Sequence, residues 1–189
     1  NNLNQGLEGI LVAETKLSNI DGEEGELTVG GYPVDEVASN AEFGESVFLL
    51  LNDRLPTKDE LIEFRTELAA RREISENTKI LLQQAAEEGV NAMDALRMGA
   101  AAANLGLSEE TDRETLMRVI AVFPTIVSTY WRYRQNKEPV EPIQDLRHAE
   151  NYLYMLTGSE PTDAATQGLE TYLTTVIDHG LNASTFTAR

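Results

Sequence analysis

A mostly α-helical fold with a short N-terminal β-hairpin is predicted by three features of this 189-residue sequence. After the first forty or so residues, apolar side chains recur at the three- and four-residue spacing of an amphipathic helix. Ser39, Thr57 and Thr111 are each followed three residues later by Glu, which is the pattern of a helix capping box. Two short β-leaning runs around a glycine-containing loop precede the first of these boxes.

The hairpin occupies the N-terminal segment, and the helices follow it. Residues 10–20 and 27–29 are the expected strands, and the acidic loop at 21–25 is a solvated turn because it lacks the ligand alternation of a calcium-binding loop. Pro124 removes a backbone donor inside the longest expected helix, so we expect a kink near residues 120–123. The expected helices are 40–52, 58–72, 76–88, 92–104, 112–136, 145–157 and 163–178.

The composition excludes several classes of protein. The 32 acidic residues outnumber the 15 basic ones, and the resulting net charge of −17 repels the phosphates of nucleic acids and of anionic lipids. The absence of cysteine excludes a disulfide, a thiolate nucleophile and an iron–sulfur cluster, and two histidines leave a zinc site short of ligands. No apolar run reaches the roughly 18 residues of a membrane span, and the sequence does not begin with a signal peptide. We therefore expect a cytoplasmic protein that binds neither nucleic acid nor membrane.

The expected helix at 92–104 has an unusually small-sided surface, because four alanines follow Gly99. Small side chains allow a second helix to approach closely. The helix therefore either packs tightly inside the domain or forms a subunit seam, and its residues favour neither. Asp94 and Arg97 lie three residues apart on it, where an exposed ion pair is expected.

Two further segments have both a functional and a structural interpretation. The basic and aromatic cluster at 130–137 suits a phosphate, but cations at a helix C-terminus also complement the helix dipole while Tyr130 and Trp131 pack inward. The structural interpretation is favoured. His148 stands alone on an amphipathic stretch and is expected to be partly exposed, without a function.

Asp178, His179 and Ser184 suggest a serine nucleophile, but this interpretation fails. Adjacent Asp and His side chains diverge by about 100° on a helix, and no oxyanion-hole sequence surrounds Ser184. What remains is a histidine at a helix end, followed by small polar residues at 180–185. Such a segment either binds a carboxylate or carbonyl ligand or caps the helix with Gly180 in the left-handed conformation, and residue chemistry leaves both open.

Several segments, spread in order over essentially the whole chain, indicate a protein family more specifically in combination than any of them does alone. The segments are Gly6–Ile10, Ala13–Gly22, Gly31–Val34, Leu55–Lys58, Met93–Arg97, Asn151–Gly158 and, above all, Asp178–Arg189. In combination they resemble the amino-terminal half of prokaryotic-type citrate synthases.

The resemblance implies a multi-helical large domain of citrate synthase type and an enzyme that condenses acetyl-CoA with oxaloacetate. It implies acetyl-CoA as co-substrate, no covalently bound cofactor and no metal. His179 is then the residue that contacts oxaloacetate, and Asn182 supports the pocket. The histidines, aspartate and arginines that complete catalysis in the family lie in its second half, so no catalytic residue is expected in this chain. Alone, it is expected to be inactive.

The same resemblance sets the expected organisation. An N-terminal segment at 1–38 contains the hairpin, and a helical large-domain portion at 39–189 stops before the small domain and most catalytic motifs. A homodimer is expected through the helices near 92–104 and 112–136. Three alternatives remain: a 2-methylcitrate synthase, which takes propionyl-CoA; a catalytically inactive, dimer-forming scaffold; and a module that only binds small carboxylates.

Overall fold

The N-terminal hairpin is present in the computed structural model, which describes residues 13–104 and 111–188. Strand β1 (Ser18–Asp21) pairs antiparallel with β2 (Glu26–Val29). A third strand, β3 (Tyr32–Pro33), was not expected and pairs with the end of β2, so the sheet order is β1-β2-β3. The first strand is shorter than expected, since residues 13–17 are not part of it. Residues 10–12 of that expected strand lie outside the described residues, as do the motif at 6–10 and Arg189.

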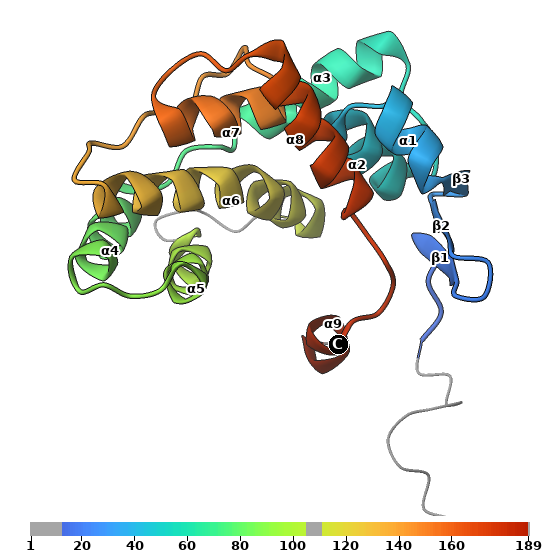
Figure 1. The fold of residues 1–189 in the computed structure, drawn as a ribbon, viewed down its shortest axis with the longest axis horizontal. Coiled ribbons are helices and arrows are strands. Elements are labelled where there is room, and N and C mark those ends of the chain that lie inside the picture. Colours follow the sequence, from blue (N-terminus) through green and yellow to red (C-terminus); the bar gives the residue numbers. More distant parts are fainter. Residues whose placement is uncertain (1–12, 105–110, 189) are drawn as a thin grey trace, which may run out of the picture.

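Helices make up most of the described chain, which confirms the mostly α-helical fold (Figure 1). All seven expected helices are present, with ends that differ by a few residues. Two short helices, α1 and α9, were not expected. In order, the helices are α1 (Val34–Asn40), α2 (Phe43–Asn52), α3 (Lys58–Ala69), α4 (Glu76–Glu87), α5 (Ala92–Ala102), α6 (Asp112–Arg134), α7 (His148–Thr157), α8 (Asp163–Thr175) and α9 (Ala183–Ala188).

Two of the three expected capping boxes are confirmed. The hydroxyls of Thr57 and Thr111 each accept a hydrogen bond of 3.3 Å from the backbone N–H three residues further on. The box at Ser39 is wrong, because Ser39 lies inside α1. The N-cap of α2 is instead Glu42, whose backbone N–H donates to the Glu45 carboxylate over 3.0 Å.

Helix α6 holds the helices together through two apolar clusters. The first lies against α4 and α5 and includes Leu82, Val122 and Ile126, all fully buried. The second joins α2 and α3 to the first half of α6, with the rings of Phe48 and Phe64 packed edge to face at 5.4 Å. Helix α6 continues through Pro124, and the size of the expected kink there stays a prediction.

The small-sided face of α5 packs inside the domain. Gly99 is buried, and a Cβ atom there would lie 2.5 Å from Cγ2 of Ile126 and 3.3 Å from Cδ2 of Leu82. Gly99 therefore lies at a close contact between α5 and α6 inside the domain. The exposed ion pair of Asp94 with Arg97 is confirmed.

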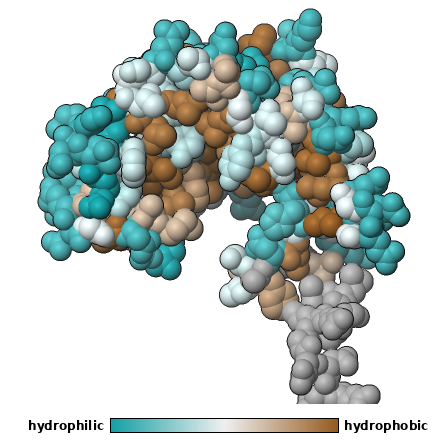
Figure 2. Space-filling model, viewed as in Figure 1, coloured by the Kyte–Doolittle hydropathy of each residue, from teal (hydrophilic) through white to brown (hydrophobic). Residues whose placement is uncertain are grey.

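The helices form an arch, and α9 lies on the hollow side, joined to the end of α8 by an extended segment (Figure 1). Hydrophobic residues gather over part of this hollow face (Figure 2). An apolar groove of about 420 Å³ lies between α2, α6 and α8, with Leu50, Leu116 and Leu173 among its lining residues. Within the described ranges, no helix is long and apolar enough to cross a membrane.

Candidate functional site

His179 and Asn182 line the same cavity, which has a volume of about 300 Å³. One wall is the segment from Val176 to Asn182, between α8 and α9. The opposite wall comes from Ala13 to Leu17, the segment that leads into β1. The fold thus brings the two ends of the described chain together around one pocket.

The helix-cap interpretation of His179 is wrong. Helix α8 was expected to run to residue 178, but it ends at Thr175, and Val176 is its C-cap. His179 therefore lies three residues beyond the C-cap, and none of the hydrogen bonds among the described residues joins its ring to a carbonyl of α8. Gly180 has a φ of +90° but belongs to the loop that follows. Among the described residues, no hydrogen bond occupies the exposed His179 ring, so both nitrogens are available to a ligand.

Asn182 has a structural task of its own at the start of α9. Its side-chain oxygen Oδ1 accepts hydrogen bonds from the backbone N–H of Thr185 at 2.9 Å and from the Thr185 hydroxyl at 3.1 Å. These bonds are those of a helix N-cap. The amide nitrogen of Asn182 is the group that remains for a ligand.

The Asp178 carboxylate does not orient the His179 ring. Its Oδ2 atom accepts hydrogen bonds from the Ser18 hydroxyl and, at 3.2 Å, from the backbone N–H of Gly180. A Ser184–His179–Asp178 triad would need that carboxylate on the imidazole, so the rejection of the triad stands. The contact with Ser18 joins residues 160 positions apart, and no local pattern in the sequence indicates it.

The charge around the pocket limits what this chain can bind by itself. Glu14 and Asp178 line the cavity, and no lysine or arginine does so among the described residues. A dicarboxylate in the pocket would face two carboxylates, and no lysine or arginine among the described lining residues would balance their charge. The cations that balance such a ligand must come from outside these lining residues.

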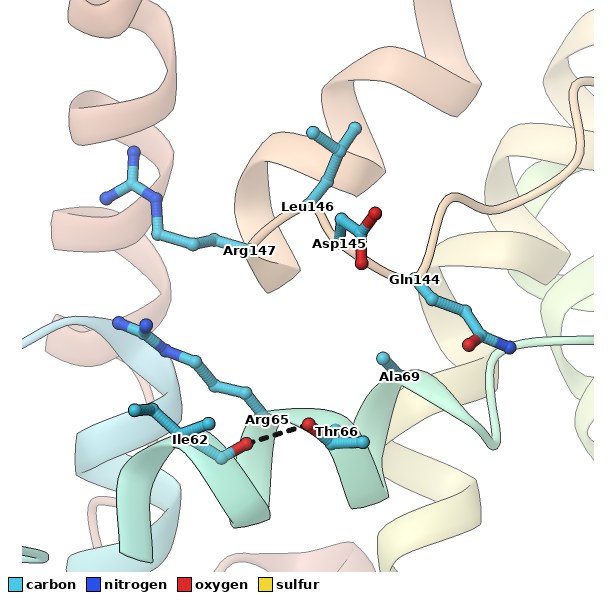
Figure 3. Close-up of a pocket in the computed structure, with 8 residues that line it drawn as sticks. All are labelled: Ile62, Arg65, Thr66, Ala69, Gln144, Asp145, Leu146 and Arg147. Carbon is cyan, nitrogen blue, oxygen red and sulfur yellow. Dashed lines mark hydrogen bonds between the residues drawn. The ribbon is translucent and has the colours of Figure 1, made fainter. Parts of the chain in front are cut away.

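A second cavity, of about 230 Å³, lies between α3 and the segment that precedes α7 (Figure 3). Arg65 and Arg147 line it, and their guanidinium groups lie on the same side of it in Figure 3. Arg65 forms an ion pair with Glu42, and Nε of Arg147 lies 3.7 Å from Oε2 of Glu150. Because both arginines already have carboxylate partners, we interpret the residues around this cavity as a junction of structural ion pairs and not as a ligand site.

His148, the first residue of α7, is buried beside this junction, and the expectation that it is partly exposed is wrong. Its ring lies 4.9 Å from the ring of Phe43. Burial, together with the positive charge of Arg72, lowers the pKa of His148 to about 3. Arg72 is itself buried and donates to the carbonyls of Ile143 at 2.6 Å and Leu146 at 2.9 Å.

We expect the buried His148 to make stability depend on pH above the range in which carboxylates titrate. The pKa of His148 is lower in the folded state than the ordinary 6.5, so its contribution is complete above pH 6.5 and is lost as the pH falls. The free energy of unfolding should drop by about 2 kcal/mol between pH 7 and pH 5. Urea denaturation at each pH measures this drop.

The matched variant for this experiment is His148→Gln, which keeps a polar side chain but cannot be protonated. Its stability should be nearly constant between pH 7 and pH 5. Losses from carboxylates such as Glu60, whose pKa is lowered to about 2 by Arg54 and Thr57, appear only below pH 4.5. Parallel pH profiles of the parent protein and the variant between pH 7 and pH 5 would contradict the prediction.

The basic cluster at 130–137 has a structural role. Arg132 donates to the Glu138 carbonyl at 2.6 Å, and Arg134 donates to the Ala86 carbonyl at 3.1 Å, near the end of α4. Tyr130 is buried, and its hydroxyl donates to the carbonyl of Val90. Trp131 is 48% exposed, so the expectation that it packs inward is wrong. Arg134 therefore supports the C-terminal end of α4, and Arg132 supports the loop that follows α6. Both arginines lie in the last turn of α6, where their charges also complement the helix dipole, as the structural interpretation predicts.

Comparisons with known proteins cover nearly the whole chain. A citrate synthase from Haloferax volcanii is 40% identical, over 98% of this chain and 52% of its own length. A 2-methylcitrate synthase from Mycobacterium tuberculosis is 33% identical, over 99% of this chain and 48% of its own length. The crystal structure of the citrate synthase from Pyrobaculum aerophilum has a TM-score of 0.86 and 34% identity, covering 97% of this chain and 49% of that one.

A second solved structure is the citrate synthase from Thermoplasma acidophilum, in a ternary complex with carboxymethyl coenzyme A and oxaloacetate. It has a TM-score of 0.86 and 27% identity, covering 95% of this chain and 48% of that one. The chain thus spans about half the length of the relatives that it matches. A family model described as "Citrate synthase, C-terminal domain" matches residues 6–189. On that match, the chain belongs to the citrate synthase family.

Proposed function

We propose that the protein of which this chain is a part condenses acetyl-CoA with oxaloacetate and releases citrate and CoA. The observation that carries the proposal is the single pocket lined by His179 and Asn182, the two residues that match the family's substrate motif. In the Thermoplasma relative, oxaloacetate and a coenzyme A analogue are bound together. Here His179 supplies a hydrogen bond to the polar end of oxaloacetate, and Asn182 supports the pocket wall.

The described residues contribute to substrate binding but do not account for the chemical step. Removing the α-proton of a thioester needs a positioned base and a donor that stabilises the enolate oxygen. One exposed histidine cannot supply both, and the neighbouring Asp178 is occupied by Ser18 and Gly180. We therefore assign no catalytic residue to this chain and expect residues 1–189 alone to be inactive. The reaction requires acetyl-CoA as co-substrate and no covalently bound cofactor.

The acyl substrate is decided by a direct comparison of acetyl-CoA with propionyl-CoA. We expect kcat/KM for acetyl-CoA to exceed that for propionyl-CoA by about tenfold or more, because one methylene in a closed pocket discriminates by about that factor. Release of CoA by the full-length enzyme, with oxaloacetate saturating, measures both constants. A preference for propionyl-CoA would instead identify a 2-methylcitrate synthase, such as the Mycobacterium relative.

The two alternatives that lack catalysis are tested in the same assay. A dimer-forming scaffold would release no CoA from either thioester in the presence of oxaloacetate. A carboxylate-binding module would bind oxaloacetate saturably, as measured by calorimetry, and would also release no CoA. Turnover by the full-length protein excludes both.

The proposed protein is a cytoplasmic homodimer that binds neither nucleic acid nor membrane. We assign residues 1–38 to an N-terminal segment that contains the sheet and residues 39–189 to the helical large domain, and α1 (Val34–Asn40) crosses this boundary. We propose that the subunits meet through the helices near 92–104 and 112–136. The contact would involve the outward-facing residues of these helices and not Gly99. Met93 on α5 is 68% exposed, and Leu116 on α6 is 44% exposed, so both helices carry apolar side chains that a partner subunit can cover.

Replacing Met93 by glutamate is expected to weaken the dimer at least about a hundredfold. Burying a methionine contributes roughly 1.5–3 kcal/mol, and a twofold axis applies the loss twice. Sedimentation of the full-length protein measures the dissociation constant. Ile80→Glu on α4 places the same charge on a residue that is 47% exposed outside the proposed contact, and it should leave the dimer intact. An intact dimer with Met93→Glu would move the contact elsewhere.

A further inference from the structure

The loop that contains His179 is fixed from both sides by a single carboxylate. Oδ2 of Asp178, the residue before His179, accepts the hydrogen bond from the backbone N–H of Gly180, the residue after it, at 3.2 Å. This bond closes a tight turn with His179 at its centre. The direction in which the imidazole leaves the backbone therefore depends on the Asp178 side chain.

The same Oδ2 atom ties the turn to the N-terminal sheet. It accepts a hydrogen bond from the hydroxyl of Ser18, the first residue of β1. Ser18 and Asp178 are both partly buried, whereas His179 is exposed. The hydrogen bond thus holds the turn from the interior side and leaves the imidazole on the open side.

The sheet is in turn anchored to the helical body. Ser18 lies opposite Val29 of β2, which is fully buried. The next residue, Gly30, donates its backbone N–H to the carbonyl of Leu17 at 2.8 Å and lies so close to α2 that a Cβ atom would be 2.6 Å from Cγ of Leu49. A continuous set of contacts therefore runs from α2 through the sheet to Asp178.

We propose that Ser18 and Asp178 are positioning residues, which hold the His179 imidazole in the orientation that binds oxaloacetate. The inference rests on the proposed function of the pocket, and it gives the N-terminal sheet a part in substrate affinity. A ligand contact is only as well placed as the hydrogen bonds that support it. Loss of the Ser18 hydroxyl leaves the Asp178 carboxylate without its link to the sheet, so the turn gains freedom and the contact from His179 weakens.

The test uses Ser18→Ala in the full-length enzyme. We expect the KM for oxaloacetate to rise about three- to tenfold, the loss that one hydrogen bond contributes, while the KM for acetyl-CoA changes less than about twofold. Ser18→Thr keeps the hydroxyl and should restore most of the affinity. Thr28→Val removes a different hydroxyl from the same sheet, one that lies 3.5 Å from the Asn19 carbonyl and does not contact Asp178, and it should leave both constants unchanged.

A double variant separates positioning from a general effect on the fold. If Ser18 acts through the imidazole, Ser18→Ala should raise the KM for oxaloacetate in the parent enzyme but not further in the His179→Ala background. Additive effects of the two substitutions, or equal changes in the constants for oxaloacetate and acetyl-CoA, would overturn the inference. If Ser18→Ala fails to fold, Ser18→Cys supplies the same comparison, because its thiol fills the same space but is a far weaker hydrogen-bond donor to Asp178.

The outcomes also distinguish this inference from the proposed function. A His179→Ala enzyme with an unchanged KM for oxaloacetate would remove the function proposed for the pocket. A His179→Ala enzyme with a raised KM, together with a Ser18→Ala enzyme whose KM is unchanged, would remove only the positioning role of the sheet.

Discussion

Replacing Gly99 by leucine is expected to lower the free energy of unfolding by about 2–3 kcal/mol. The first added carbon would lie 2.5 Å from Cγ2 of Ile126, a distance that no relaxed pair of carbon atoms adopts. Ile126 is fully buried and β-branched, and Leu82 on the other side is also fully buried, so neither can turn away into solvent. Helix α5 must therefore move off α6, which opens the first apolar cluster.

Gly168→Leu is the matched control for this prediction. Gly168 lies inside α8 and is exposed, and a Cβ atom there would meet nothing within 4 Å. Glycine is a poor helix former, so this substitution should stabilise the protein by about 0.5–1 kcal/mol. Urea denaturation of the two variants measures both effects. A Gly99→Leu protein of unchanged stability that no longer dimerises would instead place Gly99 in a subunit seam.

The same substitution is expected to destabilise the protein at Gly99 and to stabilise it at Gly168, and the sequence alone does not predict this difference. Helix periodicity and the caps at Thr57 and Thr111 are local, and local chemistry predicts them well. Whether a helical glycine is covered by another helix depends on residues distant in the sequence, here Ile126 for Gly99. The small-sided surface of α5 predicts a close helix contact, but only the tertiary structure identifies the partner.

Short elements escape prediction for a related reason. Helices α1 and α9 have seven and six residues, too few for a hydrophobic period to repeat, and α1 has no side-chain cap. The polar residues at 180–185 suggest a ligand site or the C-cap of the preceding helix, and neither interpretation predicts that Asn182 caps the N-terminus of α9. The burial of His148 depends on Phe43 and Arg72, which no local pattern connects with it.

The pocket was only partly predictable. The resemblance to citrate synthases singled out His179 and Asn182, and residue chemistry alone left His179 between a ligand contact and a helix cap. Because α8 ends at Thr175, the interpretation of His179 as a helix cap is excluded. The other wall of the pocket comes from the segment Ala13 to Leu17, and Ser18 beside it donates a hydrogen bond to Asp178. In the sequence, this segment shows only the pattern of a β-hairpin, so its part in the pocket could not be predicted.

Replacing His179 by alanine in the full-length enzyme is expected to raise the KM for oxaloacetate at least about tenfold. A hydrogen bond to a charged group of a ligand contributes roughly 1.5–3 kcal/mol, which corresponds to a factor between about ten and one hundred fifty. The KM for acetyl-CoA should change much less, because the pocket wall at 176–182 contacts only one of the two substrates in the proposed arrangement. The exposed side chain of His179 has no hydrogen bond among the described residues, so the melting temperature should stay within about one degree.

The comparison of kinetics with stability makes this prediction specific to a ligand contact. Steady-state kinetics with oxaloacetate and acetyl-CoA varied separately give the two Michaelis constants, and a thermal melt of the same preparation gives the stability. His179→Asn keeps a hydrogen-bond donor on a shorter side chain, so its KM for oxaloacetate should lie between those of the parent enzyme and the alanine variant. A histidine that only stabilises the loop would give the opposite result, a lower melting temperature with an unchanged KM for oxaloacetate, and His179 would then no longer be assigned to the substrate site.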